Sequence, residues 1–309
     1  MRGPGTIRVR VMALAAAISS ASPKAAEAVQ QMGLLDLMVK EVDSGIDVLT
    51  QLNALELLAE LASTANGADF IAAGNICGRL ANIISAEDMD PLVRASALAV
   101  AGRLLSSTDS RPSSISQSQT QLVVWAIDTF LERLNNRKAN GERIDESEEA
   151  AALDALGQIG LNEHGAEVLL MRPSPAARHV FQAAWRPYTG GRQLAAVHAL
   201  ASIMGAERSG PSGPLLSKAA EDCISDLLYS SVAEAPGSPT PGDAVWLALQ
   251  QSPEMRIAVY RLLTVMIARP WGLSEFCLHD KLVDYVTDPR TETTKTGTSK
   301  TKLEQRSCR

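Results

Sequence analysis

The sequence predicts an all-α fold, an α-solenoid in which successive helical repeats stack on one another. A helical phrase at residues 54–62, with a glycine-containing phrase at 66–71, returns in register 98 residues later, at 152–160 and 164–169. Hydrophobic residues make up 46% of the chain and aromatic residues 4%, which suits a core of small aliphatic side chains between helices. The last apolar position of the phrase recurs with steps of 43, 43, 55, 44 and 63 residues, at Ile18, Leu61, Leu104, Ile159, Ile203 and Met266.

This spacing identifies the kind of repeat. Periods of about 40 to 47 residues with two or three helices are typical of armadillo and HEAT repeats, which bury their apolar stripes against neighbouring repeats. The sequence contains no alternating strand pattern of useful length. An ordinary helix bundle stays an alternative, because Leu- and Ala-rich helices also align with one another by chance.

The first predicted helix covers the apolar run at residues 11–18. Arginines precede this run and no acidic residue appears before Glu27, so a targeting signal is the alternative interpretation. The repeat explains the run better, because aligning Ile18 with Leu61 makes it the last helix of a repeat. No apolar stretch in the sequence reaches the roughly 18 residues of a membrane-spanning helix.

Two glycines, Gly33 and Gly74, are predicted to turn the chain sharply between short helices. A residue without a Cβ atom adopts such turns at little cost. The two glycines lie 41 residues apart, close to one repeat period. The flanking helices are expected at residues 23–32, 34–42, 67–73 and 76–84.

The repeats are expected to form one solenoid domain over residues 1–290, which starts in the middle of a repeat. Residues 291–309 are basic and almost free of apolar side chains, and are expected to be a disordered tail. Segments rich in Ser, Pro, Gly or charge interrupt the helical pattern as inserts, near residues 106–120, 135–149, 205–214 and 233–242.

The residues predict no catalytic chemistry, cofactor or metal. The four histidines are isolated from cysteines and from one another, and no glycine-rich phosphate loop is present. Acidic neighbours such as Glu148 and Glu149 are expected on solvated helix faces. The net charge of −6 argues against nucleic acid, which a basic surface attracts. The four cysteines show no paired spacing, which indicates reduced thiols and a cytoplasmic or nuclear location.

The C-terminal part of the sequence carries a resemblance to a known family. Its most specific block is the Arg-Pro-Trp-Gly step at residues 269–272. The other shared features are Ser-Pro-Glu-Met-Arg at 252–256, Leu262, Leu263 and Leu-Val-Asp-Tyr-Val at 282–286. These residues, together with the glycines and helices of residues 33–84, resemble the 26S proteasome non-ATPase regulatory subunit 5 family. The resemblance spans about residues 8–288.

The resemblance implies an armadillo/HEAT-like chaperone of proteasome assembly. Members of the family grip the C-terminal domain of an AAA ATPase subunit of the 19S regulatory particle, and leave as the base meets the 20S core. They have no catalytic residues to carry over. This sequence departs from the family because the N-terminal half is missing and the tail after residue 290 does not continue the family's terminal helices.

A partner-binding surface is expected on the last helix of each repeat, which lines the concave face of armadillo proteins. Positions on that face that are not apolar point toward a bound partner. Their mixed charges suit a folded, charged partner domain. Aligning the copies selects Glu56, Glu60, Arg103, Asp154, Gln158, His198, Ser202 and Arg261.

Two other armadillo functions stay open. A nuclear-import adaptor would carry Trp and Asn ladders on these helices, with the tryptophans stacking on peptide lysines. The Trp position here is occupied by Glu56, Ala99, Asp154, His198 and Arg261, and the Asn position by Glu60, Arg103, Gln158, Ser202 and Val265. The ladder is therefore absent. A general scaffold, such as a ubiquitin-pathway armadillo protein, is the other alternative.

Overall fold

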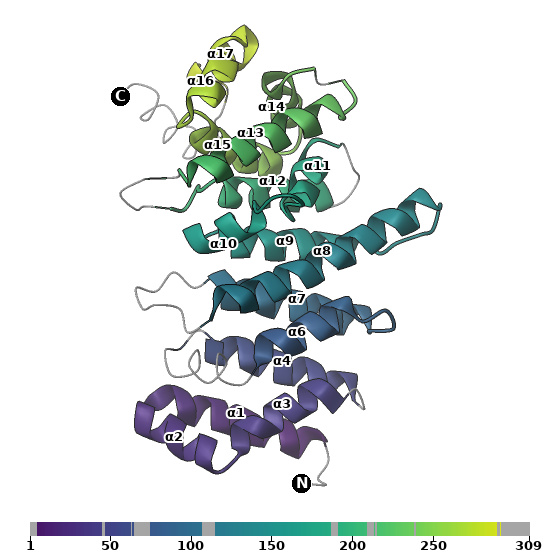
Figure 1. Ribbon diagram of the computed structural model, residues 1–309, viewed down its shortest axis with the longest axis vertical. Helices are drawn as coiled ribbons and strands as arrows, with labels where there is room; N and C mark the ends of the chain where they lie inside the picture. The colour runs from purple at the N-terminus through teal and green to yellow at the C-terminus, as the bar shows by residue number, and fades with distance from the viewer. Residues whose placement is uncertain are drawn as a thin grey trace. The chain divides into compact units, whose positions relative to one another are not determined.

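The structure is a computed structural model that describes residues 5–44, 47–62, 64, 75–106, 115–186, 191–208, 213, 215–237, 239–288 and 291. Over this part of the chain it has sixteen α-helices and no strand (Figure 1). The all-α prediction is therefore confirmed. The chain divides into two compact units, Met1–Ile144 and Asp145–Arg309, each with its own stack of helices.

The helices of unit 1 pack on one another in a stack. Helix α1 packs on α4 and α4 packs on α7, while α3 packs on α4 and α6 on α8 (Figure 1). We call α1, α4 and α7 the inner helices of unit 1, since they contain the recurring phrase. The helices are α1 (Gly5–Ala21), α2 (Pro23–Gln31), α3 (Leu34–Ser44), α4 (Val48–Ala62), α6 (Ile76–Ser85), α7 (Pro91–Ser106) and α8 (Gln117–Ala139).

Local sequence signals set several of these helix ends. The Ser22 side chain accepts a hydrogen bond from the backbone N–H of Ala25, and Pro23 occupies the first turn of α2, as is typical of helix starts. Gly33 has φ of +65° between α2 and α3, so the predicted glycine turn is confirmed there. The other predicted turn, at Gly74, and the helix at 67–73 lie outside the described residues.

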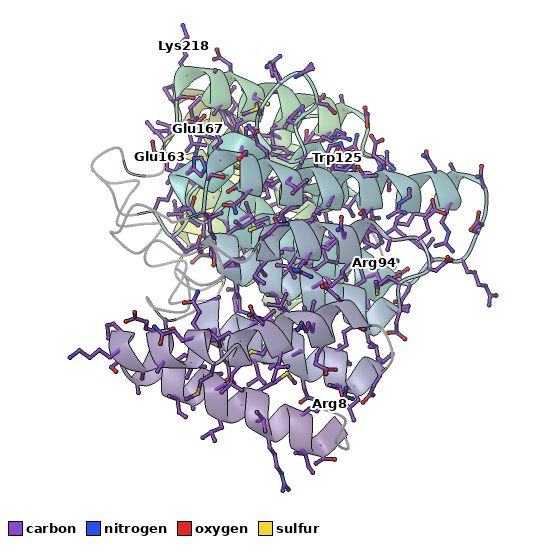
Figure 2. All side chains as sticks on the ribbon, turned by 60° about the horizontal axis from the view of Figure 1, so that its bottom comes forward. Arg8, Arg94, Trp125, Glu163, Glu167 and Lys218 are labelled. Carbon is purple, nitrogen blue, oxygen red and sulfur yellow. The ribbon has the colours of Figure 1, made fainter. Side chains whose placement is uncertain are left out.

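Unit 2 repeats the arrangement. Helix α9 packs on α12 and α12 packs on α15, and these are the inner helices of unit 2. Glu167, which lies on α10 (Figure 2), accepts hydrogen bonds from the backbone N–H and the hydroxyl of Ser217, just before α13, at 2.8 and 2.9 Å. The helices are α9 (Glu146–Ile159), α10 (Glu163–Leu169), α11 (Arg178–Trp185), α12 (Arg192–Ile203), α13 (Lys218–Ala233), α14 (Pro241–Leu249), α15 (Pro253–Met266), α16 (Pro270–Cys277) and α17 (Asp280–Thr287).

Two glycines let α9 and α12 approach closely. A Cβ atom added to Gly157 would lie 2.6 Å from the Cα of Ala199, and one added to Gly160 would lie 2.5 Å from Cγ1 of Ile203. Neither space holds a further carbon atom without movement of the neighbour. The recurring phrase therefore buries Ala199 and Ile203 against the inner helix that precedes them.

Most of the recurring apolar positions lie in the core, as the repeat predicts. Leu61, Ile159 and Ile203 are 0% exposed, and Leu104 and Met266 are 2% exposed. Ile18 on α1 differs, because 40% of it is exposed. The first copy of the phrase therefore has an uncovered side within the part of the chain that the structure describes.

Helices extend into the segments that we expected as inserts. Helix α8 continues to Ala139 and α9 begins at Glu146, so the connection is shorter than residues 135–149. Residues 107–114 and 292–309 lie outside the described part of the chain. The expectation that Glu148 and Glu149 are solvated is wrong, because they are 7% and 2% exposed. Arg192 on α12 reaches α9 and forms an ion pair with Glu149 at 2.7 Å.

A second ion pair, in which the arginine is buried, involves the first residue of the Arg-Pro-Trp segment. The Arg269 side chain is 1% exposed and donates to both carboxylate oxygens of Glu221 on α13, at 2.6 and 2.9 Å. It also donates to the backbone carbonyl oxygens of Val265 and Met204, at 2.8 and 3.2 Å. Arg269 thus joins the end of α12, the start of α13 and the end of α15. None of the described helices is long and apolar enough to cross a membrane.

Candidate functional site

The inner helices of unit 1 carry three of the predicted partner-binding residues. Glu56 and Glu60 lie one turn apart on α4 and are exposed, because their helical phase places them opposite the buried Leu55, Leu58 and Leu61. Arg103 is exposed near the end of α7, the next inner helix. Unit 1 therefore offers two acidic groups and a basic group on neighbouring helices.

The inner helices of unit 2 hold the other five predicted residues in two hydrogen-bonded groups, a pair on α9 and a network between α12 and α15. On α9, the side-chain amide of Gln158 donates to Asp154 at 2.7 Å. Between α12 and α15, Nη1 of Arg261 lies 2.5 Å from Nδ1 of His198, and Nη2 donates to the Ser202 hydroxyl at 3.3 Å. Hydrogen bonds thus join the polar positions of α12 and α15 directly. The sequence alignment had shown only that these residues occupy corresponding positions of the repeat.

Glu207 belongs to this network, and our sequence analysis missed it. Its carboxylate accepts a hydrogen bond from Nη2 of Arg261 and forms an ion pair with it. Glu207 follows α12 in a turn within the segment that we expected as a Pro/Gly-rich insert. In the sequence, Glu207 is recognisable only as an acidic residue just after the end of an inner helix. A search for helical periodicity does not select such a residue.

The surroundings of His198 keep its imidazole neutral near pH 7. Burial lowers the pKa of His198 below its usual value, and the positive charge of Arg261 lowers it further. The carboxylates of Asp154 and Glu207 act in the opposite direction. Because a guanidinium only donates, Nδ1 of the neutral ring must accept from Arg261. His198 therefore serves as a hydrogen-bond acceptor for the arginine.

Metal-ligating residue types and the two buried thiols were compared with known kinds of reactive site. No group of three His, Cys, Asp or Glu residues in the described ranges has the arrangement of a metal site. Burial raises the pKa of the Cys77 thiol to about 11 and also raises that of Cys223. Both thiols are therefore poor nucleophiles near neutral pH. The polar surface of the inner helices is suited to contacts with another protein.

Stacked inner helices with a polar outward face define an armadillo-type helical repeat protein. Comparison with known proteins places the chain more closely. A family model described as proteasome non-ATPase 26S subunit matches residues 1–304. The chain belongs to this family.

Two curated relatives agree with the family match. The chain is 24% identical over 301 residues to 26S proteasome non-ATPase regulatory subunit 5 of Bos taurus. It is 23% identical over 299 residues to the protein of the same name of Homo sapiens. Each match covers 94% of this chain and 54% of the relative, so the chain spans about half the length of these relatives.

Solved structures support the fold. An engineered protein matches with a TM-score of 0.60 and 15% identity, covering 87% of this chain and 96% of its own. A designed armadillo repeat protein in complex with the peptide (KR)4 matches with a TM-score of 0.58 and 12% identity, covering 87% and 98% of the two chains. The prediction of an armadillo/HEAT-like α-solenoid is confirmed.

Proposed function

We propose that this chain is a non-catalytic chaperone for assembly of the 19S regulatory particle base of the 26S proteasome. In this proposal it binds an AAA ATPase subunit through its inner helices. The family match over residues 1–304 carries the proposal. The relatives named as proteasome non-ATPase regulatory subunit 5 support it, although the chain spans only 54% of their length.

The chemistry of the inner helices suits a folded partner with charges of both signs. Glu56 and Glu60 present two carboxylates to one patch of the partner, and Arg103 presents a guanidinium on the next inner helix. Complementary charges at such positions accelerate association and select the partner. Arg261 is already bound within its own unit, so it contributes a pre-formed polar surface.

The proposed action needs no covalent chemistry. The chain would hold the ATPase subunit by surface complementarity and would be released when later subunits cover the same surface. We place this action in the cytoplasm or the nucleus, in agreement with four cysteines that lack paired spacing.

The proposal is tested by binding to purified regulatory-particle ATPase subunits, one at a time, and by capture of tagged protein from cell extract. We expect direct binding to one ATPase subunit, and capture of base sub-assemblies with little complete 26S proteasome. Absence of binding to every ATPase subunit would overturn the proposal.

The runner-up is an armadillo adaptor or scaffold of nuclear import or the ubiquitin pathway. The designed armadillo neighbour holds a basic peptide, but its low identity supports only a shared fold. The positions that would carry a Trp ladder hold Glu56, Asp154 and His198 instead. Recovery of import receptors or ubiquitin ligases without ATPase subunits would favour the runner-up.

A further inference from the structure

Helices α4 and α7 each begin with an exposed leucine. Leu49 is the second residue of α4 and Leu92 is the second residue of α7, and they are 69% and 67% exposed. They lie 43 residues apart, which is also the interval between the buried Leu61 and Leu104 on the same two helices. The exposed leucine therefore occupies the same position of two successive repeats.

The same kind of cap holds both leucines at the start of their helices. The backbone N–H of Leu49 donates to the Asp47 carboxylate at 3.2 Å, and that of Leu92 donates to Asp90 at 2.9 Å. Helix α4 packs on α7, and the axes of packed helices lie about 8–10 Å apart. The two side chains are therefore neighbours, and we call Leu49 and Leu92 the leucine row.

The leucine row lies on the same outward face as the charged residues that are predicted to bind a partner. Glu56 and Glu60 follow Leu49 by seven and eleven residues, intervals that return to one face of a helix. Arg103 follows Leu92 by eleven residues. All three charged residues are exposed. The outward face of α4 and α7 is thus apolar where the helices begin and charged toward their ends.

The charges on this face favour a cation of the partner at one position. Helix α4 carries no basic residue. On α7, the position equivalent to Glu56 is the uncharged Ala99, whereas the position equivalent to Glu60 is Arg103. A Lys or Arg of the partner is therefore attracted most strongly to Glu56, because Arg103 repels it beside Glu60. Seven residues of helix separate Glu56 from Leu49 by about 10 Å along the axis.

These observations identify the kind of element that fits the face. We propose that the leucine row and Glu56 form the docking site for one amphipathic helix of the ATPase subunit. The docking helix places an apolar side chain against Leu49 and Leu92 and, about two turns along, a Lys or Arg beside Glu56. This inference rests on the proposed function, because it takes an ATPase subunit as the partner.

The two parts of the docking site contribute differently. Covering the leucine row removes apolar surface from water, so the leucines supply most of the affinity. An ion pair at an exposed residue such as Glu56 adds little affinity, because solvent and salt screen it. Its effect is to fix the direction of the docking helix, since only one direction brings the cation to Glu56.

The test measures the affinity of the full chain for each purified ATPase subunit by isothermal titration calorimetry, at about 0.15 M and about 0.5 M NaCl. Leu49→Ser with Leu92→Ser should weaken binding by about tenfold or more at both salt concentrations, because burial of apolar surface is not screened. Glu56→Gln should weaken binding a few-fold at the lower salt concentration and should have almost no effect at the higher one.

Two control variants separate the leucine row from a general change in surface polarity. Met32 after α2 and Leu122 on α8 are 72% and 41% exposed and lie off the inner helices, so Met32→Ser with Leu122→Ser should bind like the wild type. Leu49→Met with Leu92→Met keeps the site apolar and should also bind like the wild type. Circular dichroism should show equal helix content in all variants.

The outcomes distinguish this inference from the proposed function. If an ATPase subunit binds but Leu49→Ser with Leu92→Ser retains the wild-type affinity, the docking inference is overturned and the proposed function stands. If no ATPase subunit binds the wild-type chain, both are overturned. A wild-type homodimer in analytical ultracentrifugation that only this serine variant loses would assign the leucine row to a second copy of the chain, and would also overturn the inference.

Discussion

The inner helices of the two units carry polar residues in the same register but present them differently. In unit 2, Arg261 contacts His198, Ser202 and Glu207, so one guanidinium joins α15 to α12 and to the turn after it. In unit 1, Glu56, Glu60 and Arg103 are all exposed. In unit 2 Arg261 thus bonds to three residues of its own unit, and in unit 1 the three charged groups lie on the surface.

The two units also differ in the small residues between successive inner helices. In unit 2, Gly157 and Gly160 allow α12 close to α9. The same register positions of α4 in unit 1 hold Ala59 and Ala62. The distance between packed helices depends on the side chains at the contact, so smaller residues allow a closer approach. A partner would compete with Glu207 for Arg261, and we therefore expect Arg261 to contribute little binding energy.

The largest expected effect compares an ion pair whose arginine is buried with one whose arginine is partly exposed. Arg269→Ala in unit 2 should lower the free energy of unfolding by about 3–5 kcal/mol, because it leaves Glu221 without its buried partner. Arg8→Ala in unit 1 should cost about 1 kcal/mol or less, since Arg8, on α1 (Figure 2), is 27% exposed beside Glu41. Urea denaturation followed by circular dichroism measures both. Equal losses would contradict the distinction.

The next effect tests the close contact between α9 and α12. Gly157→Ala should destabilise the protein by about 1–3 kcal/mol, because the added Cβ would lie 2.6 Å from the Cα of Ala199. The intrinsic preference of helices for Ala over Gly, about 1 kcal/mol, acts in the opposite direction.

A matched glycine provides the control for this contact. Gly191, at the start of α12, has no atom of the described residues within 4 Å of an added Cβ, and it has an ordinary helical φ of −74°. Gly191→Ala should therefore leave the urea midpoint nearly unchanged. If Gly157→Ala proves equally neutral, the glycine contact does not hold α12 in place.

The third effect concerns partner binding and the two inner surfaces. Glu56→Lys with Glu60→Lys should weaken binding to the ATPase subunit by about tenfold or more, because like charges then meet across the interface. Arg261→Ala should weaken it only a few-fold, because Arg261 is already paired with Glu207. Calorimetric titration with the purified subunit measures both affinities.

The control for these charge reversals must lie off the inner helices. Glu87 and Asp88 are exposed in the turn between α6 and α7, so Glu87→Lys with Asp88→Lys gives the same change in net charge. We expect this variant to bind like the wild type. A loss equal to that of the Glu56 and Glu60 variant would indicate long-range charge effects instead of a contact.

Sequence periodicity predicted the parts of the molecule that depend on one helix at a time. It gave the inner helices, the buried position of Leu61 and the turn at Gly33. It failed where burial depends on a distant residue. Glu149 resembles a solvated acidic residue until Arg192, on another helix, forms an ion pair with it.

The residues predicted to bind a partner show the same limit. Alignment placed His198 and Arg261 in the same phase of two repeats, but it could not show that their side chains meet. Glu207 was missed because it follows the end of α12, where helical phase no longer applies. The sequence therefore does not reveal which side chains of different repeats meet, even where each repeat is clearly recognisable.

The smallest expected effect is a pH dependence confined to the bonded face of unit 2. The pKa of His198 is lowered in the folded protein, mainly by burial and then by Arg261, so the unfolded chain binds the proton more readily. Stability should be fully present above the ordinary histidine pKa of 6.5 and should fall as the pH drops through the lowered value. The loss should be about 0.5–1 kcal/mol, since protonation removes the acceptor for Arg261. In His198→Gln, whose side-chain oxygen still accepts a hydrogen bond but does not titrate, the decrease in urea midpoint between about pH 7.5 and pH 5.5 should be smaller. An identical decrease in the two proteins would show that other groups cause the acid sensitivity. It would contradict the claim that protonation of His198 weakens the contact between α12 and α15.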